Sequence, residues 1–493
     1  MKRIFIVLLA AAVFFATCAI SCAYKITDDV NLNVNFLEQF RSETWDTFDN
    51  GAPDKDDGYT FMSSKMRLGI GATSKFIDAY TQFQWTQLIN LPDDAMYGTG
   101  GLYYKQNNGS RNVGYACLSQ GWIKGRMPGF EALSVRLGRF LYKSGLEPNT
   151  LPKNKTLAWL KKKRISQRLI GPFDWSRVGR GYDGVQAAYN DSSWNLTFSA
   201  MHPTPGGFYL KRDQASKNGY TSNDIDMITV AATMKDSVIQ GMDSQVFYYY
   251  YNDHRGLYED GMGDADEIST FGGHILYNTP KIGPGSFDLL AWGAYQTGTY
   301  SSQKQRKRLD QGGYAIALEG GYKFSDIMWQ PWIRGGYFRG SGDDDPTDND
   351  HDTFFMMIPT LRVYAMTPFY NLMNTTYGFG QLIFKPLDKL VVRSDVTRLW
   401  LTKDNDAWYQ GSGMTRADQF GYGAKTAHIG RGHDSLGTMW DISFFIKDIY
   451  NYMGASLGMN LYYSHVFGDD VIEDNFPEDE DMNFFYVEGI IKF

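Results

Sequence analysis

Hydrophobic and polar residues alternate with a period of two along much of this chain. In residues 193–201 the even-numbered positions are Trp, Leu, Phe and Ala, and Asn, Thr and Ser stand between them. Residues 455–464 repeat the pattern, with Ala, Leu, Met, Leu and Tyr at the odd-numbered positions. Such alternation is typical of a β-strand with one apolar face. The second face is small or polar rather than charged, which favours membrane strands over those of a soluble sandwich.

Alternating segments recur from end to end of the chain, and they predict about eighteen strands. We place these strands at 31–45, 61–72, 76–88, 115–124, 132–142, 181–190, 193–201, 226–235, 243–251, 268–278, 284–297, 312–323, 328–339, 375–385, 388–401, 436–448, 453–466 and 483–493.

The connections between these strands differ in length on the two sides. Residues 73–75, 190–192 and 324–327 are short connections, whereas the long ones are 46–60, 89–114, 143–180, 340–374 and 402–435. Short periplasmic turns and long extracellular loops are typical of outer-membrane barrels. We therefore predict an all-β fold, a transmembrane antiparallel up-and-down β-barrel. Closure leaves no open sheet edge, and a barrel this wide keeps an aqueous lumen.

The N-terminus predicts export from the cytoplasm. A basic start, Met1-Lys-Arg, precedes an apolar run at 4–20 and a small-residue cleavage site at 21–23. This pattern is typical of a secretory signal peptide, with cleavage expected before Tyr24. A lipoprotein cut before Cys22 is the weaker alternative, because the usual Leu three residues earlier is missing. Residues 24–493 contain no apolar run of the length that a spanning helix needs, so we expect one barrel domain in the bacterial outer membrane.

Composition narrows the function further. The chain has 493 residues, with 33 Tyr, 32 Phe and 12 Trp, yet its mean hydropathy is only -0.38. The net charge of -7 argues against a nucleic-acid partner. Of the 3 cysteines only Cys117 lies beyond the leader, which excludes a disulfide framework and a cysteine-rich metal site. We expect no cofactor and no metal centre.

The alternation also assigns basic side chains to the lumen. In 132–142, Leu133, Val135 and Leu137 face lipid, so Arg136 faces inward. The same reasoning, applied to the other strands, places six basic side chains in the lumen: Arg41, Lys65, Arg67, Arg136, Arg334 and Arg393.

The long loop 143–180 adds further cations and has the length to fold into the mouth or lumen. These are Lys161, Lys162, Lys163, Arg164, Arg168, Arg177 and Arg180. A cationic lumen attracts anions, and guanidinium groups pair well with carboxylates. The alternative is that each lumen arginine pairs with a lumen carboxylate and stiffens the wall.

Acidic residues concentrate in the predicted loops. They occur at 343–352, at 478–481 and at Asp54, Asp56 and Asp57. The spacing does not match the helical-loop calcium motif. We expect solvated surface loops, which divalent cations could bridge to the phosphates of outer-membrane lipid.

One stretch carries a family resemblance. Residues 168–185, RLIGPFDWSRVGRGYDGV, resemble the R-x-I-G-x-x-D-W-x-x-x-G-R-x-[FY]-D-G segment of the bacterial alginate-export family of outer-membrane barrels. The preceding strand reads VRLGRF at 135–140, where Phe140 stands in place of the family's Gln. The resemblance implies an eighteen-stranded barrel that conducts an anionic polysaccharide. By motif match, the family's conduit residues correspond to Lys65, Arg67, Arg136, Arg139, Arg168, Arg180 and Asp183.

Three classes of function remain at this point. The favoured one is a passive channel for a polyuronate-like polysaccharide, with a general small-anion or sugar porin as the alternative. An outer-membrane hydrolase needs His with Ser or paired Asp at the rim, and the only close triplet is His433-Asp434-Ser435. Chain neighbours rarely form a catalytic geometry, so we predict that the protein is not an enzyme. An adhesin or receptor built on the long loops would be a secondary role.

Overall fold

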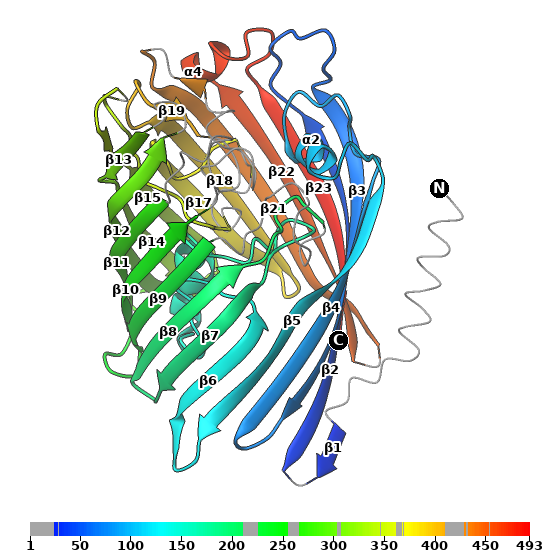
Figure 1. Ribbon diagram of the computed structural model, residues 1–493, viewed down its shortest axis with the longest axis vertical. Coiled ribbons are helices and arrows are strands. Elements are labelled where there is room, and N and C mark those ends of the chain that lie inside the picture. Colours follow the sequence, from blue (N-terminus) through cyan, green and yellow to red (C-terminus); the bar gives the residue numbers. More distant parts are fainter. Residues whose placement is uncertain are drawn as a thin grey trace.

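The computed structural model describes residues 24–27, 29–210, 225–254, 266–302, 307–345, 347–360, 367, 369–409, 428–429, 432–452 and 454–493. Within this part of the chain, antiparallel strands form a closed barrel in which each strand pairs with its neighbours along the sequence (Figure 1). The barrel strands are β2 (Val30–Asp46), β3 (Gly58–Thr73), β4 (Ile77–Ile89), β5 (Val113–Met127), β6 (Phe130–Phe140), β7 (Tyr182–Asn190), β8 (Trp194–Pro203), β9 (Ile225–Met234), β10 (Met242–Asp253), β11 (Asp266–Asn278), β12 (Gly285–Ser302), β14 (Tyr314–Phe324), β15 (Trp332–Gly340), β17 (Thr375–Leu387), β18 (Leu390–Leu401), β21 (Ser435–Tyr452), β22 (Ala455–Gly468) and β23 (Met482–Lys492).

Closure is made by β2, which pairs with both β3 and the last strand, β23. Asn31 lies opposite Thr73 on one side, and Leu37 lies opposite Lys492 on the other. All eighteen predicted strands are confirmed within the described residues. The largest difference in a boundary is at β12, which ends at Ser302 rather than at residue 297, and β15 begins at Trp332 rather than at residue 328.

Short elements decorate the barrel. Lys307–Gln311 (β13) and Asp350–His351 (β16) extend the sheet, and β1 (Tyr24–Thr27) pairs with β2 below the barrel. Ala407–Trp408 (β19) and His428–Ile429 (β20) pair separately. The helices are α2 (Thr99–Gln106), α3 (Lys155–Leu160), the π-turn η1 (Lys161–Ile165) and α4 (Asp470–Glu473). No helix among the described residues is long and apolar enough to cross a membrane.

The two faces of the wall differ as the alternation predicts. On the outer face, Ile123, Leu137 and Val246 are 57–67% exposed, which is expected of side chains that meet lipid. On the inner face, polar side chains such as Thr197 and Gln296 are buried. The short turns gather at the lower end of Figure 1 and the long loops at the upper end, so the lower end is the periplasmic one.

Residues 141–181, which we call the inner loop, fold into the barrel and carry α3 and η1 (Figure 1). The Asn154 side chain begins α3 by accepting hydrogen bonds from the backbone N–H groups of Thr156 and Leu157. Apolar side chains of the loop are buried, among them Leu160, Leu169 and Ile170. A second loop segment pairs with it, since Ile170 and Ile358 form a parallel bridge. The inner loop is therefore packed into the lumen rather than extended over the mouth.

Candidate functional site: the lumen and its inner loop

The inner loop places a carboxylate against two basic residues of β3. Arg67 reaches both oxygens of Asp174, with Nη2–Oδ1 at 2.6 Å and Nη1–Oδ2 at 3.1 Å. Lys65 Nζ lies 2.8 Å from the Asp174 carbonyl oxygen and 3.3 Å from Oδ1. Burial opposes ionisation of Asp174, but Arg67 and Lys65 outweigh it and hold the pKa of this carboxyl well below its usual value. Two wall cations therefore hold one carboxylate of the inner loop at this point.

A second contact joins the inner loop to β2 and β23. Arg41 donates to Glu488 from Nη2 at 2.7 Å and from Nε at 3.0 Å, and Arg177 of the loop donates to the same oxygen at 2.9 Å. The Arg41 guanidinium also lies 4.6 Å from the centre of the Trp175 ring. Two arginines thus share one wall carboxylate, and an aromatic ring of the loop covers one of them.

The opposite wall holds the loop through Glu319 on β14. Arg164 donates to it from Nε at 2.8 Å, Arg168 from Nη2 at 3.3 Å, and Arg334 of β15 from Nη1 at 3.1 Å. Arg334 also donates to Asp288 at 3.0 Å. All of these side chains are buried, and three guanidinium groups converge on one carboxylate.

A fourth anchor lies at the start of η1. Lys161 Nζ lies 2.8 Å from Asp243 Oδ1, and His274 Nε2 lies 3.0 Å from the same oxygen. None of the three side chains has exposed surface. The inner loop is therefore tied to β10 and β14 on one side of the lumen and to β2, β3 and β23 on the other.

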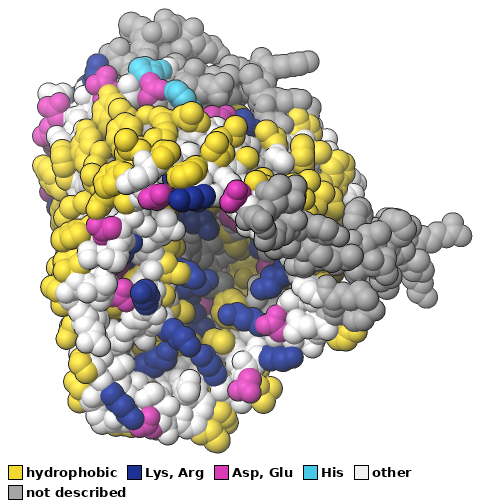
Figure 2. All heavy atoms as spheres, turned by 90° about the horizontal axis from the view of Figure 1, so that it is seen from below, with side chains coloured by type: hydrophobic (Ala, Val, Ile, Leu, Met, Phe, Trp, Pro, Cys, Tyr) yellow, Lys and Arg dark blue, Asp and Glu magenta, His cyan; other side chains and the backbone are white. Residues whose placement is uncertain are grey.

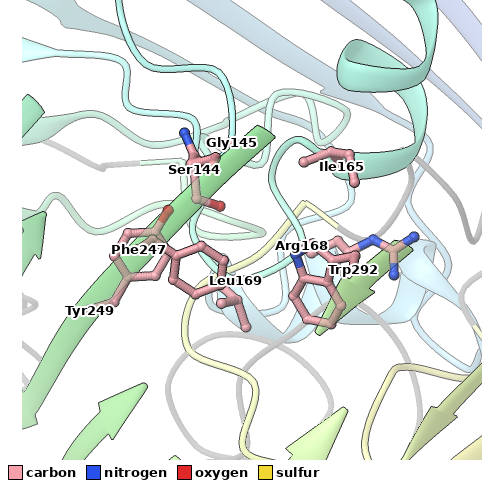
Figure 3. Close-up of a pocket in the computed structure, with 9 residues that line it drawn as sticks. Ser144, Gly145, Ile165, Arg168, Leu169, Phe247, Tyr249 and Trp292 are labelled. Atoms are coloured by element: carbon pink, nitrogen blue, oxygen red, sulfur yellow. The ribbon is translucent and has the colours of Figure 1, made fainter. Parts of the chain in front are cut away.

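A small cavity remains between the inner loop and the wall (Figure 3). Its volume is about 10 Å³, and its lining comes from the loop and from β10 and β12. Arg168 lies beside Trp292 there, with the guanidinium carbon 5.0 Å from the ring centre. The lining residues are Ser144, Gly145, Ile165, Arg168, Leu169, Gln245, Phe247, Tyr249 and Trp292. This volume is about that of one water, so the loop and the wall are closely packed.

The remaining predicted cations differ in their surroundings. Arg136 faces inward and donates from Nη2 to Gln186 at 2.7 Å, and no described carboxylate pairs with it. Arg393 also faces inward and forms an ion pair with Asp395 on its own strand. Arg180 is buried, with its guanidinium carbon 5.5 Å from the centre of the Phe173 ring.

Arg139 and Asp183 lie on the outer face rather than in the lumen, which corrects their assignment to the conduit. Arg139 lies opposite Asp183 and donates to it twice at 2.7 Å. Arg139 shares its face of β6 with Leu137, which is 57% exposed, and Asp183 lies opposite the exposed His202. Arg136 and Arg139 are three positions apart, and residues an odd number of positions apart point to opposite faces of a regular strand. The motif match had grouped them together.

The carboxylates that anchor the loop were missing from the predicted site. Asp174, Asp243, Glu319 and Glu488 each hold one or more cations of the predicted set or of the long loop. Inward alternation in 312–323 and 483–493 was a signal for Glu319 and Glu488. The stiffened-wall alternative therefore describes most of the buried arginines.

The triplet His433-Asp434-Ser435 does not assemble a catalytic arrangement. His433 Nδ1 lies 3.1 Å from Asp474 Oδ2, whereas Ser435 Oγ donates to Asp469 at 2.8 Å. Histidine and serine are thus directed to different carboxylates, and no nucleophile–base pair forms between them.

The acidic loops use their carboxylates locally. Asp343 Oδ1 accepts from the Asp345 backbone N–H at 3.1 Å, and Asp348 Oδ1 accepts from that of Asp350 at 2.8 Å. Within the described residues, no group of three or more His, Cys, Asp or Glu side chains is arranged to hold a metal ion.

Comparison with solved structures relates the fold to outer-membrane porins. OccAB1 of Acinetobacter baumannii superposes with a TM-score of 0.60 at 13% identity, covering 96% of this chain and 99% of that one. OccK9 (OpdG) of Pseudomonas aeruginosa gives 0.59 at 10% identity, with 94% and 97% covered. The outer membrane protein OpdK of the same organism gives 0.56 at 8% identity, with 94% and 99% covered. A search of curated proteins gives no match.

The closed barrel and its lumen define an outer-membrane channel, with the fold of transport porins rather than of enzymes. The alginate-export family matches residues 160–484, which is more than half of the chain. The chain belongs to the alginate-export family and resides in the bacterial outer membrane.

Proposed function

We propose that this channel passively conducts an anionic solute, a polyuronate-like polysaccharide, through a lumen lined by arginine and lysine. The observation that carries the proposal is the bidentate ion pair in which Arg67 donates to both carboxylate oxygens of Asp174. Uronate sugars carry the same group, so Asp174 occupies the place that a substrate carboxylate would take. Guanidinium is suited to this geometry because its N–H groups match the two carboxylate oxygens.

Permeation needs contacts that are weak enough to break. Most lumen cations already form an ion pair with a carboxylate of the wall or loop, as Arg41 does with Glu488. A passing anion would replace that carboxylate for a short time, so each contact stays weak. Arg136 is different, because its described polar partner is the neutral Gln186 and aromatic rings lie on it. Its charge is therefore available to a solute. The conduit set that we propose is Arg41, Lys65, Arg67, Arg136, Arg168, Arg177, Arg180, Arg334 and Arg393.

A small-anion porin is the second candidate, and the packed inner loop favours it. The loop is anchored on both sides of the lumen, which leaves less room for a polymer. OpdK, which shares the fold, has been crystallised with vanillate, a small carboxylate. Loop displacement would separate the two candidates, since only a polymer requires it.

Single-channel recording in planar bilayers tests the proposal. A polyuronate should interrupt the current at concentrations where a neutral polysaccharide of equal length has no effect. If small carboxylates carry current while the polyuronate neither blocks nor passes, the small-anion porin is the correct function. If neither anion interacts with the pore, both candidates fail.

The processing of the chain is a further part of this proposal. Residues 1–23 form a signal peptide that is removed before Tyr24, and residues 24–493 are the single barrel domain. N-terminal sequencing of the protein isolated from outer membranes tests this: a mature chain that begins elsewhere would contradict it.

A further inference from the structure

The periplasmic side of the inner loop carries lysines that differ from their chain neighbours. On η1, Lys161 and Arg164 are buried in ion pairs, whereas Lys162 and Lys163 between them are exposed. Neither exposed lysine forms a side-chain hydrogen bond or an ion pair with a described residue. Within the turn η1, two cations therefore bind carboxylates of the wall, and the two lysines between them face solvent within the barrel.

Further cations surround these lysines. Lys163 lies within electrostatic reach of Arg393, Lys447, Lys143 and Lys162, so the cluster joins the loop to β18 and β21. Viewed from the periplasmic end, Lys and Arg side chains gather around a hollow in the molecule (Figure 2). Lys163 has accessible surface but is enclosed by the barrel, and this partial desolvation together with these four cations lowers its pKa to about 8. The cluster is therefore a region of concentrated positive potential.

The carboxylates near this cluster are already engaged. Asp395 pairs with Arg393, and Asp441, its register partner on β21, accepts the hydroxyl hydrogen bond of Tyr462. No described carboxylate forms an ion pair with Lys143, Lys162, Lys163 or Lys447. Lys143 lies within electrostatic reach of Asp174, whereas the charged groups that face Lys163 are all cations. Lys163 therefore differs from the buried cations that Asp174, Glu319 and Glu488 neutralise.

We propose that Lys143, Lys162, Lys163 and Lys447, with Arg393, form an anion-binding site at the periplasmic mouth that takes an extended polyanion. The inference rests on the proposed function and adds the place where the solute first binds. The site is spread over the loop and two wall strands, so a small anion can meet only part of it. A chain with repeated charges can contact several lysines at once, and each contact stays weak and reversible.

The chemistry of lysine favours binding of an extended polyanion over binding of a small ligand in one fixed orientation. Its ammonium is a point charge on a flexible stem, without the planar fork that orients a carboxylate. Lys155 and Lys385 both lie within electrostatic reach of Lys323 and extend the positive region. The acidic segments 343–352 and 478–481 lie in long loops at the opposite end. A polyanion would therefore bind at the periplasmic mouth and be repelled from the extracellular rim.

Amine labelling measures occupancy of this site directly. The purified channel is acetylated at pH 8 with and without a long oligogalacturonate, and each lysine is quantified by mass spectrometry. We expect the oligomer to slow acetylation of Lys162 and Lys163 several-fold, because it covers them and raises the pKa of Lys163. Lys55, exposed on an extracellular loop, serves as the reference and should be unaffected.

Two controls define the outcomes. Monomeric galacturonate at the same carboxylate concentration should give little protection; equal protection would contradict a site for an extended chain. Unchanged labelling with the oligomer would overturn the site altogether. An anion preference of the pore that persists in that case would leave the proposed function standing, so the two failures are distinguishable.

A charge-matched pair of variants supplies the second test. Lys162→Gln with Lys163→Gln should abolish current block by oligogalacturonate added on the periplasmic side. Lys55→Gln with Lys105→Gln removes the same charge from exposed positions elsewhere and should leave the block intact. Block that survives equally in both double variants would contradict the site. All four lysines are exposed and lack described side-chain partners, so the barrel should fold normally.

Discussion

Arg67 of the barrel wall holds both carboxylate oxygens of Asp174, a residue that lies 107 positions further along the chain in the inner loop. This contact links the two questions that the structure raises, what the lumen binds and what keeps the loop inside it. A solute carboxylate and Asp174 would compete for the same guanidinium.

Removing the loop carboxylate should expose the cations beneath it. Asp174→Asn leaves Lys65 and Arg67 without their counter-charge, so we expect stronger anion preference and a noisier open channel. The Asp174 side chain is 36% exposed, so the loss of stability should be smaller than the roughly 3–5 kcal/mol of a fully buried pair. Reversal potentials under a salt gradient provide the measurement. A selectivity identical to that of the unmodified protein would show that Asp174 does not mask these cations.

Two arginines of β6 form a natural matched pair, because they lie on opposite faces of one strand. Arg136→Gln should reduce the anion preference, since it removes a lumen charge that has no described acidic partner. Arg139→Gln should leave selectivity unchanged, since Arg139 pairs with Asp183 on the outer face. The two variants carry the same change in charge. Equal effects on the reversal potential would contradict the assignment of faces.

Glu319 is the point at which three guanidinium groups meet. Glu319→Gln removes the charge that neutralises Arg164, Arg168 and Arg334, and breaking a buried pair of this kind costs about 3–5 kcal/mol. We expect the inner loop to loosen while the barrel stays closed. Hydrogen exchange should rise across 161–170, with the wall strand β8 as an internal control. Protection that stays unchanged at 161–170 would mean that Glu319 is not an anchor.

The acidic loop 341–360 should respond to pH. Burial, together with Asp406, Asp348 and Asp352, raises the pKa of Asp343 from 3.8 to about 7. A folded-state pKa above the unfolded value means that the folded loop binds the proton more tightly, so its stability falls as pH rises from about 4 to 7. Asp343→Asn should remove this dependence and protect the loop at pH 8. Limited proteolysis across this pH range is the measurement. A loop that becomes more resistant to the protease as pH rises would contradict the prediction.

The sequence predicts the barrel well because each strand carries its own pattern. Residues 193–201 alternate without interruption, and the structure gives β8 at nearly the same bounds. The early start predicted for β15 has a specific cause. Met328 and Trp329 are apolar and exposed, yet Trp329 and Gln330 have positive φ angles of 68° and 47° and belong to the turn. Apolar residues in that turn imitate the beginning of a strand.

The site was only partly predictable. The inward direction of Lys65, Arg67, Arg136 and Arg334 follows from strand alternation alone and is confirmed. Their partners depend on how the inner loop folds, and no local pattern places Asp174 beside Arg67. The family motif assigned Arg139 to the lumen, but the Arg139 side chain points outward, as the alternation of β6 requires.

The most direct test of the central claim is the reversal potential of the purified channel in a planar bilayer under a potassium chloride gradient. A positively lined lumen predicts a reversal potential with the same sign as the chloride equilibrium potential. Arg136→Gln should move that reversal potential toward zero. A potential of the opposite sign, set by potassium, would contradict an anion-conducting lumen.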